Sequence, residues 1–162
     1  MRVSTADYVI GDVSGVAACY PLVDPGGPGP EVSLTVDDRY SSSVAIGFGF
    51  PFYGTNYNNL VVSTNGYVSF NTALAGTFSH WDDYDNLPST EYDEGLIMGP
   101  YHDLNPNTTN SPNKKAKYNV IGTAPTRKWV LSFYKMPLFD CTSLFENTHQ
   151  IILHESSGII EV

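Results

Sequence analysis

The sequence predicts an all-β fold, an antiparallel and jelly-roll-like β-sandwich with long acidic loops and little helix. Its composition is aromatic-rich and charge-poor, with 13% Phe, Trp and Tyr and 15% Asp, Glu, Lys and Arg, against a usual charged fraction of about a quarter. Short apolar segments alternate with polar residues and are separated by turn residues at intervals of about ten, which is typical of a sandwich. No segment carries an apolar stripe at helical spacing, so we expect little helix.

Individual elements follow from this alternation and from the positions of Gly, Pro and Asn. The tight hairpin at Asn65-Gly66 is the clearest, because Asn-Gly between apolar residues favours a turn in which both residues take φ > 0. The predicted strands cover residues 7–10, 31–36, 43–48, 61–62, 67–68, 95–101, 117–121, 127–135 and 149–155, and a further strand begins after 158. The predicted turns and loops are 21–30, 50–54, 73–94, with one helical turn, and 105–112.

The core side of the strands is expected from the same period of two. In the strand 127–135, Trp129, Leu131 and Phe133 share one face, and the alternate residues share the other. In the strand 149–155, Ile151 and Leu153 share a face.

Length and charge limit the organisation and the partners. The 162 residues are expected to form a single sandwich domain that is a piece of a longer chain, because a last strand starts just before the end. With 17 acids against 8 bases the net charge is -9, which disfavours nucleic acid and anionic lipid and favours cations or neutral sugars. No apolar run long enough to insert into a membrane is present.

The two cysteines leave two alternatives open. Cys19 and Cys141 lie in turn-rich surroundings far apart in the chain. If they pair, the disulfide closes most of the chain, is worth about 4 to 5 kcal/mol in the loop-entropy model and indicates an oxidising compartment. The alternative is two unrelated thiols, because sequence does not supply the geometry that a bridge requires.

The middle of the chain is acidic and supplies candidate calcium ligands. Seven acids lie between residues 82 and 103, and no Lys or Arg occurs between Arg39 and Lys114. Ca²⁺ prefers six to eight such hard oxygen ligands. The alternative is a solvated acidic loop, since no EF-hand spacing is present. The candidate ligands are Asp82, Asp83, Asp85 and Asp103, with Glu91, Asp93 and Glu94 in the same segment.

Aromatic residues in the same region are candidates for ligand binding. Rings beside Asp and Asn suit a sugar, because they combine apolar stacking with hydrogen-bond acceptors for hydroxyls. The alternative is that these rings cap the end of the sandwich core. The candidates are Trp81, Tyr84, Tyr92 and Tyr101.

No catalytic residue is predicted. His102-Asp103 and His80-Trp81-Asp82 are His/acid pairs of the kind a hydrolase uses to orient a general base. However, no Gly-x-Ser-x-Gly nucleophile elbow occurs, and a structural hydrogen bond is the expected role of His102. The residues 107–109, Asn-Thr-Thr, match an N-glycosylation acceptor by pattern.

Five segments in order carry a resemblance to a known family. They are the aromatic-Pro-Phe-Tyr-Gly turn ending at Gly54, the hairpin 61–70, and the segments 97–103, 129–133 and 150–153. This order resembles the nidogen-like extracellular β domain, and more closely a domain of very large bacterial surface proteins of the gliding-motility adhesin type, exported by type IX secretion. The resemblance covers about Val44 to Val162.

The resemblance implies an extracellular, non-enzymatic module of a cell-surface adhesin. Its partners would be neighbouring domains of the same chain, surface glycans or other cell-surface proteins. The secretion route is implied by the relatives alone. The alternative function is a carbohydrate-binding module attached to a secreted enzyme.

Overall fold

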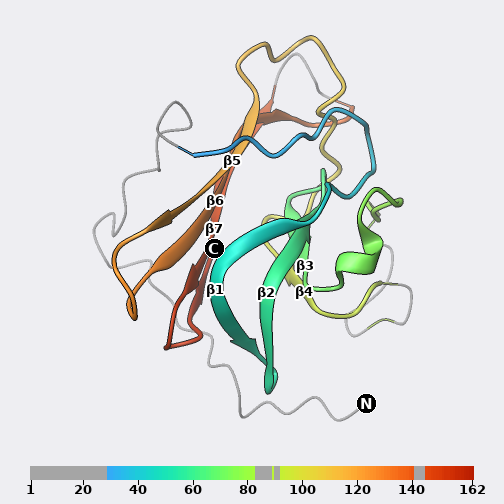
Figure 1. The fold of residues 1–162 in the computed structure, drawn as a ribbon. Coiled ribbons are helices and arrows are strands. Elements are labelled where there is room, and N and C mark those ends of the chain that lie inside the picture. Colours follow the sequence, from blue (N-terminus) through green and yellow to red (C-terminus); the bar gives the residue numbers. More distant parts are fainter. Residues whose placement is uncertain (1–28, 83–88, 90–91, 141–144) are drawn as a thin grey trace, which may run out of the picture.

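Two four-stranded antiparallel sheets pack face to face in the computed structural model, which describes residues 29–82, 89, 92–140 and 145–162 (Figure 1). The first sheet contains β1(Val44–Phe52), β2(Thr55–Val62), β3(Tyr67–Ser69) and β4(Leu96–Met98). The second contains β5(Lys115–Ile121), β6(Lys128–Pro137), β7(Glu146–His154) and β8(Ile160–Glu161). The helical element of the described residues is one short 3₁₀ helix, η1(Thr72–Leu74). The predicted all-β sandwich with little helix is confirmed.

The strands follow chain order within each sheet, 1-2-3-4 and 5-6-7-8. This order is simpler than the crossovers of a jelly roll, and it builds each sheet from one contiguous half of the strand-forming chain. The connection 99–114 passes from the first sheet to the second (Figure 1). Within the described residues, no helix is long and apolar enough to span a membrane.

The core lies between the two sheets, with β6 as the best-paired strand. β6 pairs with β5 from Lys115↔Tyr134 to Ile121↔Lys128 and with β7 on its other side. The residues predicted to share a face in the last two long strands are all fully buried between the sheets; they are Trp129, Leu131, Phe133, Ile151 and Leu153. From the first sheet they meet Ile46, Phe48, Phe50, Leu60 and Val68 in the same cluster.

The β1–β2 connection is a two-residue turn. β1 continues to Phe52, beyond the predicted strand 43–48, because the residues after Gly49 still pair with β2. The turn therefore contains Tyr53 and Gly54 alone. Both have positive φ, 45° and 79°, as a two-residue hairpin turn compatible with strand twist requires.

The Asn65-Gly66 hairpin differs from the predicted two-residue turn. Gly66 has φ 83°, whereas Asn65 is not among the residues with positive φ. The Ser63 N–H donates to the Tyr67 carbonyl at 2.8 Å, so the loop contains three residues and ends on the left-handed glycine. This is the next most common hairpin class, and it leaves the Asn65 side chain free to make long-range contacts.

The segment 31–36 is not the regular strand that its alternation predicts. Val32 and Leu34 are buried as expected, but pairing is limited to the bridge Glu31↔Lys117 and to the Val32 N–H, which donates to the Ala116 carbonyl at 2.8 Å. The segment then leaves the edge of β5. In this segment the alternating burial therefore comes from side-chain packing and not from continuous hydrogen-bonded pairing with β5. The strand predicted at 7–10 lies outside the described residues.

His149 on β7 fixes how the Asn65-Gly66 loop sits against the second sheet. Its ring stacks on Phe133 at 4.5 Å, and its Nε2 lies 3.3 Å from the Gly66 carbonyl. Burial lowers the pKa of His149 to about 4, so the ring is neutral at physiological pH. A Cβ at Gly99 would lie 2.8 Å from the Gly66 oxygen, which shows how closely the backbone segments approach.

We expect Leu131→Ala to lower the free energy of unfolding by about 2 to 5 kcal/mol, because it removes a fully buried side chain from the sheet interface. Ile121→Ala is the matched control: the same kind of side chain is 38% exposed at the end of β5, and its loss should cost under about 1 kcal/mol. Urea unfolding of both variants checks this. Equal losses would contradict the assigned core.

Candidate functional site

The Asn65-Gly66 loop at the end of the first sheet gathers three other segments of the chain. Its backbone is tied to the first of them by a reciprocal pair of bonds. The Arg39 N–H donates to Thr64 Oγ1 at 3.0 Å, and the Thr64 N–H donates to the Arg39 carbonyl at 3.1 Å. The loop is thereby held against the residues that precede β1.

The side chain of Asn65 then links all of these segments. It is fully buried. Its Nδ2 donates to Asp38 Oδ1 at 3.0 Å and to the His80 carbonyl at 3.2 Å. Its Oδ1 accepts from the Leu104 N–H at 3.0 Å, and its own carbonyl accepts from the His102 N–H at 3.3 Å. A single neutral residue therefore fixes the segments around residues 38, 80 and 103.

Three carboxylates meet beside this amide. Asp37, Asp38 and Asp103 each place one carboxylate oxygen so that the three oxygens lie within 4.8 Å of one another, and all three residues are half-buried. Oδ1 of Asp37 and Oδ1 of Asp103 are buried and accept no hydrogen bond from any described residue. We call this group the carboxylate cluster.

The cluster is electrostatically unfavourable by itself. The pKa of Asp37 is raised to about 6 by burial and by the charge of Asp38. The pKa of Asp103 is raised to about 6 by burial and then by Asp38, Asp37 and Asp140. Both carboxylates are still mainly ionised at neutral pH, so like charges crowd a partly desolvated space. Hard oxygen ligands in this arrangement fit a divalent cation such as Ca²⁺.

The structure does not bring the described members of the predicted metal site together. Asp103 lies in the carboxylate cluster, but its neighbours there come from residues 37 and 38, not from Asp82. The Asp82 side chain instead lies 4.0 Å from His80 Nδ1. Asp83 and Asp85 lie outside the described residues. Calcium binding therefore stays a prediction, and Asp37 and Asp38 are candidate ligands that the sequence analysis missed.

A network of tyrosine side chains packs beside the carboxylate cluster. It includes two of the predicted sugar-binding aromatics, Tyr92 and Tyr101. The Tyr67 hydroxyl donates to the His80 carbonyl at 3.1 Å. The hydroxyls of Tyr92 and Tyr101 both donate to the Asp82 carbonyl, at 2.7 and 2.5 Å. Burial raises the pKa of Tyr101 well above its ordinary value, so this phenol remains a neutral donor.

The tyrosines therefore hold the loop backbone of residues 80–82. Their rings contact one another edge to face, with Tyr67–Tyr101 centroids at 5.4 Å and Tyr92–Tyr101 centroids at 6.0 Å. Two other aromatic side chains of this loop face solvent: Phe78 is 56% exposed and Trp81 is 38% exposed. Tyr84 lies outside the described residues.

Of the two predicted His/acid pairs, His80 Nδ1 lies 4.0 Å from Asp82 Oδ1. His102 is exposed and contributes its backbone N–H to Asn65, so a structural hydrogen bond is present but comes from the main chain. His80 contacts Phe78 and Tyr92 edge to face, at 5.4 and 5.8 Å. Cys19 and Cys141, the predicted disulfide pair, lie outside the described residues.

The fold and the site together define the class: an all-β sandwich whose candidate functional residues are gathered on loops at one end. The chain belongs to the NIDO-related family, whose model matches residues 20–162. This match confirms the nidogen-like resemblance at the level of the family. No curated protein and no solved structure gives a significant match.

Because two carboxylates of the cluster have raised pKa values, the free energy of unfolding depends on pH. The pKa of Asp103 means that the folded state holds the carboxyl proton up to about pH 6, whereas the unfolded chain releases it near the ordinary aspartate value of 3.8. The unfolding free energy therefore falls as pH rises from about 4 to about 6, and the loss persists above that window.

We expect Asp103→Asn to melt a few degrees above the wild type at neutral pH without divalent ions, because it removes this repulsion, and the difference should shrink as pH approaches 4. Thermal melts followed by circular dichroism check this. Glu94→Gln, at an exposed position, is the control and should show no such trend. A pH-independent difference would contradict the assignment.

If the carboxylate cluster binds Ca²⁺, calcium should raise the melting temperature, since a ligand at a hundred times its Kd stabilises the folded state by about 2.7 kcal/mol. EDTA should reverse the shift, and Asp103→Asn should abolish it. Differential scanning calorimetry of both proteins provides the measurement. An unchanged melting temperature of the wild type removes the calcium prediction.

Proposed function

We propose that this chain is a non-enzymatic, extracellular module of a bacterial cell-surface adhesin of the gliding-motility type, exported by type IX secretion. Membership of the NIDO-related family supports an extracellular module. The acidic net charge of -9 is compatible with a surface protein that recognises neutral or cationic groups. Neighbouring domains of the same chain, surface glycans or other cell-surface proteins are the proposed partners.

The observation that carries the recognition role is the loop of residues 77–82, which presents Phe78 and Trp81 on a fixed backbone. Its carbonyls at Thr77, His80 and Asp82 all accept hydrogen bonds from the folded body. The Ser79 N–H donates to the Asp38 carbonyl at 2.9 Å. Residues 77, 79, 80 and 82 are thus anchored, and each of the two exposed rings lies between two anchored residues.

A fixed loop suits recognition because little conformational entropy is lost when a partner binds. Aromatic side chains are also enriched among the residues that dominate binding energy. Asp82, which is half-buried, directly follows Trp81 and adds a carboxylate to this loop. A partner that combines an apolar surface with hydroxyl or cationic groups would match both features.

The second candidate is the carbohydrate-binding module. The exposed ring of Trp81 favours it, since such a ring can stack on a sugar. The other two predicted sugar-binding aromatics that the structure describes, Tyr92 and Tyr101, give this candidate less support. The hydroxyls of Tyr92 and Tyr101 are occupied by the Asp82 carbonyl, so these two residues act mainly in positioning the loop.

We expect Phe78→Ala and Trp81→Ala each to weaken the attachment of protein-coated beads to cells of the organism that makes this protein by roughly tenfold. Each substitution removes an exposed aromatic ring that is available to a partner. Tyr53→Ala is the control: that ring is 52% exposed at the opposite end of β2. Melting curves confirm that each variant is folded. Attachment that is unaffected by either loop variant would overturn the recognition role.

A glycan array screened with the same proteins separates the two candidates. Binding to a defined glycan that is lost in Trp81→Ala would favour the carbohydrate-binding module. Attachment to cells without glycan binding would favour the adhesin.

A further inference from the structure

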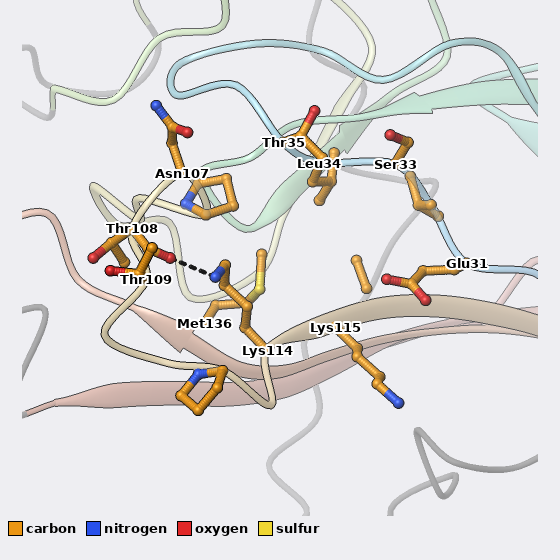
Figure 2. Close-up of a pocket in the computed structure, with 14 residues that line it drawn as sticks. Glu31, Ser33, Leu34, Thr35, Asn107, Thr108, Thr109, Lys114, Lys115 and Met136 are labelled. Atoms are coloured by element: carbon orange, nitrogen blue, oxygen red, sulfur yellow. Dashed lines mark hydrogen bonds between the residues drawn. The ribbon is translucent and has the colours of Figure 1, made fainter.

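A pocket of about 700 Å³ lies away from the carboxylate cluster, between the segment 31–35 and the loop 106–112 at the start of β5 (Figure 2). Cavities of roughly 300–1,000 Å³ are the usual size of small-molecule sites. Its floor is apolar and is formed by Val32, Leu34, Ala116 and Met136. Its rim carries hydroxyl groups from Thr108 and Thr109, whereas the hydroxyls of Ser33 and Thr35 point away from the cavity (Figure 2).

The pocket is a built feature, because both of its walls are anchored. The first wall, the segment 31–35, is held at its start by the bond from the Val32 N–H to the Ala116 carbonyl, and beyond this bond it diverges from β5. The other wall is fixed by the fully buried Ser111, whose hydroxyl contacts the Lys135 carbonyl and Glu146 Oε1, both at 2.8 Å. The space between the walls is therefore present before a ligand arrives.

The charge of the pocket is opposite to that of the protein. Three of the eight basic residues fall within four positions, at Lys114, Lys115 and Lys117, and the first two line the pocket. Glu31 is the single acidic residue among the fourteen that line it. A local excess of positive charge on a chain of net charge -9 is where an anionic group would be attracted.

Lys114 is the group best placed to receive that anion. Its Nζ donates to the Thr108 carbonyl at 2.5 Å and to the Ser111 carbonyl at 3.2 Å. An ammonium group has three donors, and within the described part of the chain Lys114 forms no ion pair. Figure 2 shows Lys114 reaching toward Thr108 at the pocket wall, whereas Lys115 points away from the cavity.

We propose that this pocket binds a short aliphatic carboxylate. The carboxylate would accept from Lys114 and from the threonine hydroxyls of the rim, and the hydrocarbon chain would lie on the apolar floor. Glu31 lies toward the other end of the pocket (Figure 2), which disfavours the reverse orientation. The inference is independent of the proposed adhesin role, because the pocket shares no residue with the loop 77–82.

The test is an NMR titration of the ¹⁵N-labelled 162-residue chain with sodium hexanoate. We expect saturable shifts at residues 106–116 with a Kd of roughly millimolar order, as suits a small ligand. Hexanamide, which has the same shape without the charge, should bind at least about tenfold more weakly. Binding of hexanoate should also weaken as salt increases, because one partner is a partly exposed charge.

Variants identify the anchoring group. Lys114→Gln should weaken hexanoate binding roughly tenfold, whereas Lys115→Gln, which changes the same charge on a side chain that points away, should leave it within about twofold. Since Lys114 also holds the loop 108–111, Ala116→Leu provides a second variant that enlarges a side chain of the apolar floor and should abolish binding. Absence of saturable binding, equal affinity for hexanamide, or equal losses in the two lysine variants would overturn the proposal.

Discussion

The side-chain amide of Asn65 is the interaction on which the loop end of the molecule depends. It supplies two donors and one acceptor to three segments that are far apart in the sequence, and it does so from a fully buried position. Without it the Leu104 N–H and the Asp38 carboxylate would each lose a partner. A buried polar group that loses its partner costs about 1 to 3 kcal/mol. The placement of the carboxylate cluster and of the loop that carries Phe78 and Trp81 therefore follows from one neutral side chain.

Two sets of ionisable groups near this amide respond to acid in opposite directions. Asp37 and Asp103 have pKa values raised to about 6, so their protonation favours the folded state as pH falls from about 6 toward 4. Burial lowers the pKa of His149 to about 4 from the ordinary histidine value of 6.5, so in the same range the unfolded chain takes up a proton that the folded chain does not. The stabilising effect of the first set is offset by the second. The Asn65-Gly66 loop lies between both.

The sandwich itself could be predicted from the sequence, because a period of two and turn residues are local signals. The buried face of β6, with Trp129 and Leu131, is the clearest case. Local signals failed where long-range packing decided the outcome. The segment 31–36 alternates in burial without forming a ladder, and the Asn65-Gly66 turn is longer than its dipeptide suggests.

The candidate site was less predictable, because its members come from three segments. Asp103 was identified among the acids of its region, but Asp37 and Asp38 precede β1 and meet it only through the packing of loops. The alternation of apolar and polar residues carries no information about a contact between two loops that are far apart in the sequence. Similarly, the hydroxyls of Tyr92 and Tyr101 bond to the Asp82 carbonyl, and sequence alone does not distinguish a ring that binds a ligand from one that positions a loop. The adjacent acids Asp37-Asp38 were the one available signal.

The division of the fold into two consecutive halves has a consequence for chains that carry several such modules. Residues 44–98 make one sheet and residues 115–161 make the other, and the apolar faces of the two halves pack against each other in one cluster. A half from one copy can therefore complete the complementary half of a neighbour, with the connection 99–114 serving as the hinge, which is the geometry of domain swapping. In a tandem array at high local concentration, intermolecular exchange would compete with correct folding, so divergence between adjacent modules would protect the array.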